Sequence, residues 1–130
     1  MKPSGETVLL YNIDSEKNRK LRMLMLRMGM RGRVVDKADY GKPVGLLAGL
    51  KDVTIEDPDG EVSDFSEEMM VMRGFTERRL DLFLQSMRRE GIERIDYKAI
   101  LTPVNSRWNS CQLYQELKKE HEQMNSRQTP

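Results

Sequence analysis

This chain of 130 residues contains one cysteine, Cys111, and one histidine, His121. A single cysteine excludes an internal disulfide, and one cysteine with one histidine leaves too few soft ligands for a zinc site. No window approaches the roughly 20 consecutive apolar residues of a membrane-spanning helix. The 22 basic and 21 acidic side chains nearly cancel, so no overall field attracts nucleic acid or an anionic membrane. We therefore expect a soluble cytoplasmic protein with no metal, no cofactor and no membrane partner.

Catalytic motifs are also missing. Neither the glycine spacing of a dinucleotide site nor that of a phosphate-binding loop occurs. His121 lies in the charged run KKEHEQ, where a surface histidine is favoured over a catalytic base. Cys111 follows Trp108 by three residues, so a thiol buried on an inner helix face is favoured over a nucleophile. No catalytic residue is therefore assigned.

Aromatic residues make up only 6% of the chain. Proteins that bind single-stranded nucleic acid stack the bases on aromatic side chains of central strands. The predicted strands carry mostly methionine, leucine and valine instead, and the arginine clusters are more typical of a solvated surface. A nucleic-acid partner is therefore not favoured.

The most informative feature present is a strand–helix unit that occurs twice, 62 residues apart. The copies cover residues 8–29 and 70–91. Each has an apolar strand, a helix-capping residue, an amphipathic helix and a terminal glycine, and superposition places the cap Asp14 on Thr76. Because each strand leads into a helix of fixed length, the pattern predicts an α/β layer structure.

Four strands are predicted, each followed by a helix. The predicted order is strand 8–11, helix 14–29, strand 33–37, helix 43–50, strand 69–72, helix 76–91, strand 95–101 and a last helix from 105 or 106 to about 124. Flanking charges indicate an edge position for the strand at 33–37. Segment 51–65 is acidic and rich in turn residues, so we expect a mobile loop. The whole chain, 1–130, is expected to form a single domain with flexible tails at 1–6 and 125–130.

Alternating strands and helices are typical of a parallel sheet with helices on both faces. With right-handed crossovers, the simplest fold is a three-layer α/β domain, in which two βαβ units form a four-stranded sheet of order 2-1-3-4. The alternative is a ferredoxin-like βαββαβ plait with an extra C-terminal helix. Continuous apolar runs in the strands 8–11 and 69–72 favour a sheet covered on both faces. The short, glycine-containing helix at 43–50 favours the plait.

In the parallel topology, polar residues that follow three of the strands meet at the carboxyl edge of the sheet. Helix N-termini and an arginine at that edge suit a phosphate or a carboxylate. The candidate ligand-binding residues are Asn12, Asp14, Arg73, Gly74, Thr76, Thr102 and Asn105. The competing interpretation is that Asp14, Thr76 and Asn105 are only helix caps. A common site requires Asn12 and Gly74 to lie at the same end of the sheet.

Four longer segments carry a resemblance: VLLYNID at 8–14, PVGLLAGL at 43–50, EEMMVMRGFT at 67–76 and KAILTPVNSRWNSCQLYQELKKEH at 98–121. Together they resemble an uncharacterised family of small bacterial cytoplasmic proteins that is catalogued as a domain of unknown function. The resemblance implies a free-standing bacterial domain and brings no assigned activity, cofactor or substrate. The positions that match the family's patterns are Asn12, Gly74, Phe75, Thr76, Thr102, Pro103, Asn105 and Trp108.

Missing catalytic groups and converging capped helices favour a non-enzymatic interaction or regulatory module. The expected partner is a small anionic ligand at the carboxyl edge, and a homo-oligomer is left open. Two alternatives also stay open. One is a small enzyme that uses Arg73, Thr102 and Asn105 to stabilise transition-state charge. The other is a nucleic-acid-binding module.

Overall fold

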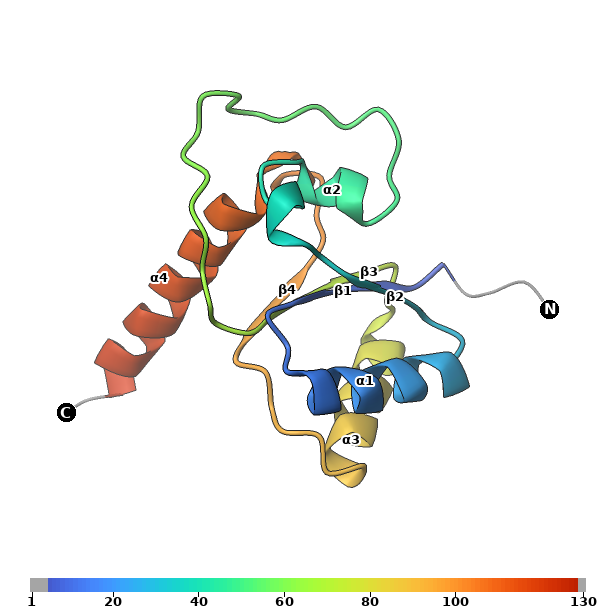
Figure 1. Ribbon diagram of the computed structural model, residues 1–130. Coiled ribbons are helices and arrows are strands. Elements are labelled where there is room, and N and C mark those ends of the chain that lie inside the picture. Colours follow the sequence, from blue (N-terminus) through green and yellow to red (C-terminus); the bar gives the residue numbers. More distant parts are fainter. Residues whose placement is uncertain (1–4, 129–130) are drawn as a thin grey trace.

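A computed structural model describes residues 5–128 of the chain (Figure 1). It contains β1 (Thr7–Tyr11), α1 (Ser15–Arg27), β2 (Arg31–Val34), η1 (Lys37–Asp39), α2 (Val44–Leu47), β3 (Met69–Arg73), α3 (Glu77–Arg89), β4 (Tyr97–Ile100), η2 (Asn105–Arg107) and α4 (Ser110–Gln128), where η marks a single turn of 3-10 helix. Of the predicted tails, residues 1–4 and 129–130 lie outside the described residues. Within the rest, Glu6 is buried and α4 continues to Gln128, four residues beyond its predicted end.

The 62-residue repeat recurs in the structure. β1 and β3 are each five residues long and start 62 residues apart, and the 13-residue helices α1 and α3 do the same. Asp14 and Thr76 cap these helices, each accepting a hydrogen bond from the backbone amide three residues further on. Gly29 and Gly91 follow the helix ends with φ of 74° and 72°. Local signals therefore set the length of both helices. A capping side chain starts each helix, and a glycine that adopts the left-handed conformation ends it.

The strand order is β2-β1-β3-β4, as predicted, but the sheet is mixed. β1 and β2 are parallel, β3 and β4 are parallel, and the central pair β1–β3 is antiparallel. The prediction of a fully parallel sheet is therefore wrong. Alternating strands and helices fix the strand direction only within each βαβ unit. The connection between the units, residues 35–68, is long enough to return the chain to either end of the sheet.

The reversed central pair also decides which helices share a face. The two units extend from the centre of the sheet in opposite directions and have opposite strand directions, so right-handed crossovers place α1 and α3 on the same face. Figure 1 shows these two helices below the sheet and α2 above it, while α4 runs obliquely along the left side. Leu113 and Tyr114 of α4 pack in the same apolar cluster as α2, so α4 covers the face opposite α1 and α3. The predicted three-layer α/β arrangement is confirmed.

The sheet buries apolar side chains on both faces. In β1, Val8 and Leu10 join the apolar cluster under α1 and α3, whereas Leu9 and Tyr11 join the cluster under α2 and α4. This alternation explains the continuous apolar run, because both faces of a central strand are covered. Phe65, which was predicted to lie in the mobile loop, belongs to the cluster under α2 and α4.

Phe65 fixes the end of the long connection to the core. Its ring stacks on Tyr40 and on Tyr114, with centroid distances of 4.8 Å and 4.3 Å. Residues 51–64 contain no helix or strand. The connection is therefore irregular in backbone, yet it is fastened at its C-terminal end by an aromatic stack that burial and ring contact stabilise.

Candidate functional site

The antiparallel β1–β3 pair divides the predicted site residues between the two ends of the sheet. Tyr11, at the end of β1, pairs with Met69 at the start of β3, and Thr7 pairs with Arg73. Asn12 and Gly74 follow the carboxyl ends of these two strands and therefore lie at opposite ends of the sheet. The expectation that all seven candidate residues share one edge is wrong, because it depended on parallel central strands.

At the first end, Asn12 holds the long connection to the sheet. Its φ of 58° lies in the left-handed region, which asparagine tolerates better than most residues. Its side-chain amide donates to the carbonyl oxygens of Phe65 and Glu67, at 2.7 and 3.1 Å. Its side-chain oxygen accepts from the Tyr40 hydroxyl at 3.2 Å. Every polar atom of this side chain is thus bonded inside the fold.

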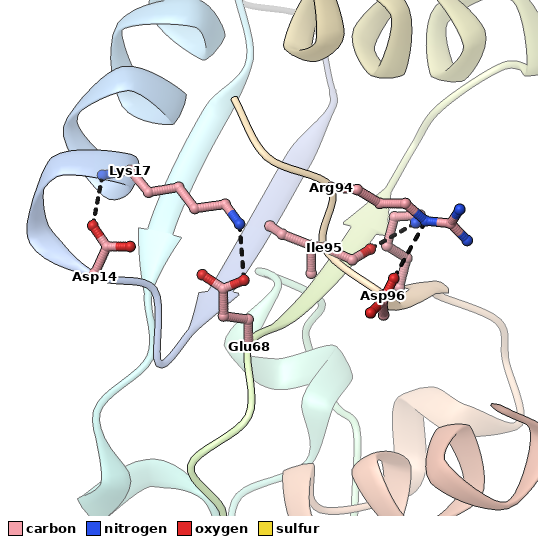
Figure 2. A network of polar contacts seen from close by, with 7 residues as sticks. Asp14, Lys17, Glu68, Arg94, Ile95 and Asp96 are labelled. Atoms are coloured by element: carbon pink, nitrogen blue, oxygen red, sulfur yellow. Dashed lines mark hydrogen bonds and ion pairs between the residues drawn. The ribbon is translucent and has the colours of Figure 1, made fainter. Parts of the chain in front are cut away.

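Asp14 lies at the same end as a helix cap. Its carboxylate accepts from the amide of Lys17 at 3.0 Å, and the Lys17 ammonium reaches Glu68 at 2.8 Å (Figure 2). Figure 2 also shows Arg94 beside Asp96, an ion pair of 3.3 Å before β4. Lys17 therefore pairs with Glu68, Arg94 pairs with Asp96, and Asp14 serves the start of α1.

At the second end, Gly74 and Thr76 lead from β3 into α3. The φ of Gly74 is 82°, and a Cβ there would lie 2.7 Å from the carbonyl oxygen of Gly5, so a side chain would clash with backbone. Thr76 caps α3 through the amide of Arg79 at 3.1 Å. Both residues shape the turn, and neither lines the cleft described next.

The second end also holds a cleft of about 470 Å³, where β3 and β4 end. Its lining residues are Leu50, Asp52, Val53, Thr54, Arg73, Leu101, Thr102, Pro103, Ser106 and Arg107. Two of the predicted candidates, Arg73 and Thr102, are therefore brought together. We call this the β3–β4 cleft.

Arg73 points to the face of the sheet that α2 covers. Alternation along β3 places it on the side of Met69 and Val71, and its Nη1 donates to the carbonyl oxygen of Ala48 at 2.9 Å, directly after α2. No acidic side chain of residues 5–128 pairs with this guanidinium within 4.0 Å. One nitrogen thus anchors the half-buried side chain, and the other two have no hydrogen-bond partner among the described residues.

Thr102 and Asn105 form a reciprocal turn beside the cleft. The Thr102 amide donates to Asn105 Oδ1 at 2.8 Å, and the Asn105 amide donates to Thr102 Oγ1 at 3.1 Å. Asn105 Nδ2 donates to the carbonyl oxygen of Ile100 at 3.0 Å. The buried Asn105 therefore positions the turn, whereas the Thr102 hydroxyl keeps its own proton for donation.

The remaining charges of the cleft are Arg107 and Asp52. The Arg107 side chain is exposed and pairs with no acidic group of the described residues. The lining thus combines two guanidinium groups and the hydroxyls of Thr54, Thr102 and Ser106 with one carboxylate, and it contains no histidine or cysteine. Such a set favours an anion over a cation.

Sequence reasoning missed the 50–54 segment and Arg107. They meet because residues far apart along the chain are tied together: the Glu56 amide donates to the carbonyl oxygen of Arg107 at 2.9 Å, and Trp108 Nε1 donates to Glu56 Oε2 at 3.1 Å. No pattern in the local sequence predicts such a contact. Arg107 could have been noticed for its place two residues after Asn105.

Ionisable groups with a shifted pKa lie outside the β3–β4 cleft. Burial raises the pKa of Tyr11 and of Tyr40. Burial, followed by the hydrogen bond to Glu67, raises the pKa of Tyr114, and that hydrogen bond lowers the pKa of the Glu67 carboxyl. Burial lowers the pKa of the Lys98 ammonium. These shifts follow from the core and its rim and mark no catalytic acid or base in the cleft.

Cys111 and His121 both lie on α4 and away from the cleft. Cys111 is buried, as predicted, with its sulfur 3.3 Å from the Ser63 hydroxyl. The ring of His121 packs edge-on against Tyr97. In the part of the chain described, no group of three or more histidine, cysteine, aspartate or glutamate residues is placed to hold a metal. No helix within 5–128 has the length and apolarity to cross a bilayer.

Comparison with known proteins finds one family. Residues 68–124 match the model of a family described as a domain of unknown function (DUF3783). The match runs from the residue before β3 through α3 and β4 into α4, and it includes Arg73, Thr102 and Arg107. It confirms the predicted resemblance to a family of unknown function over this part of the chain. Neither a curated protein nor a solved structure matches the chain.

Proposed function

We propose that this chain is a non-enzymatic interaction or regulatory module that binds a small anion in the β3–β4 cleft. One observation carries the proposal: Arg73 and Arg107 line the same cleft with Thr102, and neither guanidinium has an acidic partner among the described residues. Guanidinium groups bind carboxylates and phosphates through two parallel hydrogen bonds. The resemblance noted in the sequence supports a bacterial cytoplasmic setting for such a module.

The size and walls of the cleft narrow the class of ligand. A volume of about 470 Å³ is within the range of small-molecule sites. Leu50, Val53 and Leu101 supply apolar walls. The ligand that fits this lining best carries a phosphate or carboxylate on a small organic body.

The hydrogen bonds of Asn105 favour a binding module over the alternative of a small enzyme. That enzyme would need Asn105 to act on a reacting atom together with Arg73 and Thr102. The side-chain oxygen and nitrogen of Asn105 are both bonded to the turn. A residue committed in this way supports the shape of the site and contacts no substrate.

Isothermal titration calorimetry with inorganic phosphate, phosphoglycolate and malonate tests the proposal. We expect at least one of these anions to bind saturably and Arg107→Gln to weaken it about tenfold, because a hydrogen bond to a charged group is worth about 1.5–3 kcal/mol. Arg78→Gln is the matched control, because Arg78 is exposed on α3 and its substitution changes the net charge by the same amount. Absence of binding by all three anions, or an equal loss in both variants, would contradict the proposal.

A further inference from the structure

The 62-residue repeat places a groove at each edge of the sheet. One lies between α1 and β2 and the other between α3 and β4. Gly32 on β2 pairs with Val8, and Lys98 on β4 pairs with Met70, which is the equivalent residue of β3. Lys98 lines its groove and donates to the carbonyl oxygen of Ile95 at 2.6 Å. Gly32 at the matching position has no side chain, and Met25 packs over it, with its Cε 2.6 Å from where a Cβ would lie. The α1–β2 groove has a volume of about 510 Å³.

The α1–β2 groove is bordered by apolar side chains that the fold leaves exposed. Leu26 and Met23 on α1 are 80% and 50% exposed, and Val34, on the same face of β2 as Gly32, is 50% exposed. Asn18 also lines the groove, and its buried side-chain oxygen has no hydrogen-bond partner among the described residues. Grouped exposed apolar side chains mark a surface that binds another molecule.

The groove runs beside an unpaired strand edge. β2 is one of the two outer strands of the sheet, as its flanking charges predicted. The amides of Arg31 and Val35 donate towards β1, to the carbonyl oxygens of Glu6 and Leu10. Backbone groups alternate in direction along a strand, so the amide and carbonyl groups of Gly32 and Val34 point away from β1. An incoming extended segment can therefore hydrogen-bond to β2.

Positive charge surrounds this edge on both faces. Arg19 and Arg22 line the groove on α1, and no acidic residue lines it. Alternation places Arg31 and Arg33 on the opposite face of β2, where Arg33 already contacts Asp39 at 3.6 Å. A second copy of this chain that paired through β2 would bring its own Arg31 and Arg33 against these residues, and like charges on neighbouring strands are destabilising. An acidic partner fits the edge better than a second copy does.

We propose that the α1–β2 groove binds an extended acidic segment of another protein, which adds to the sheet beside β2. Alternate apolar side chains of that segment contact Leu26 and Met23, and the acidic side chains between them face Arg31. Backbone hydrogen bonds supply affinity, and the alternating pattern supplies specificity. This surface is separate from the β3–β4 cleft, so each proposal stands without the other.

Three fluorescent nine-residue peptides test the proposal by fluorescence anisotropy. The first alternates Glu and Val, starting and ending with Glu; the second has Lys in place of Glu; the third has the composition of the first in two blocks, five Glu and then four Val. We expect the alternating Glu peptide to bind, with an affinity that falls as salt rises. The other two should bind at least tenfold more weakly. Equal binding of the Lys peptide or of the block peptide would overturn the proposal.

Variants locate the binding on the surface. Leu26→Ala and Arg31→Glu should each weaken the alternating Glu peptide at least fivefold, because Leu26 contacts its apolar side chains and Arg31 faces its acidic ones. Their matched controls on α3, Leu82→Ala and Arg78→Glu, should change its affinity less than twofold, because Leu82 and Arg78 are exposed on another helix. Arg107→Gln should leave it unchanged, which separates this surface from the cleft. A concentration-dependent dimer in light scattering that Leu26→Ala abolishes would overturn the proposal in favour of a second copy.

Discussion

Single residues in this chain are often set by contacts with distant segments. Gly45 is an example, because a Cβ there would lie 2.7 Å from the Ser106 Cβ and 3.0 Å from the Ser106 carbonyl oxygen. Sequence reasoning treats a glycine in a helix as a weakness. In the folded chain its missing side chain is what allows α2 to lie against η2. Ser106 lies 61 positions further along the chain, so the sequence around Gly45 does not predict the contact.

Gly45→Ala should therefore destabilise the protein. We expect the free energy of unfolding to fall by about 1–3 kcal/mol, because the backbone of Ser106 cannot move aside as a flexible side chain can. The roughly 1 kcal/mol by which alanine favours a helix over glycine offsets only part of the cost of that clash. Gly41→Ala is the control, since the nearest atom to its added Cβ is 3.5 Å away in Val62. Urea denaturation measures both, and equal stability of the two variants would show that the contact with η2 is unimportant.

At the scale of elements, helix ends could be predicted, and the contacts between elements could not. The caps Asp14 and Thr76 and the glycines that follow α1 and α3 act within about four residues of themselves, so the sequence contains their whole signal. The predicted anion site combined both caps with Arg73 and Thr102. Only Arg73 and Thr102 line the β3–β4 cleft. A cap and a ligand-binding residue carry the same side chains at the same place in a helix, so sequence alone does not separate them.

Asp14→Ala and Thr76→Ala separate the two roles by experiment. Each should lower the free energy of unfolding by about 1 kcal/mol, because one amide of the first helical turn loses its acceptor. Neither should change the affinity of an anion for the β3–β4 cleft. Chemical denaturation and calorimetry on the same samples measure both quantities. A fivefold loss of anion affinity in either variant would show that the cap belongs to the binding site.

For the whole molecule, the sequence predicted the strand order and the three layers but not the direction of the central pair. Order and layers follow from short-range rules: each βαβ unit has a right-handed crossover, and apolar runs require two covered faces. The relative direction of the two units depends on the connection at 35–68, whose C-terminal end is fixed by the stack of Phe65 on Tyr40 and Tyr114. A single phenylalanine after an acidic loop gives no signal of that stack. One reversal therefore moved Asn12 and Asp14 away from the cleft.

Amide hydrogen exchange followed by NMR tests this architecture and both binding surfaces in the free protein. We expect the slowest exchange in β1 and β3, because both edges of these central strands are paired. Along β2 and the residue after it, exchange should alternate. The amides of Arg31 and Val35 donate towards β1 and should be protected, whereas those of Gly32 and Val34 should exchange fast. Protection of the last two amides equal to that of β1 would mean that the edge of β2 is already covered, which would remove the surface proposed for an acidic segment. Binding of the alternating Glu peptide should slow exchange at these two amides, whereas binding of an anion in the β3–β4 cleft should leave them unchanged.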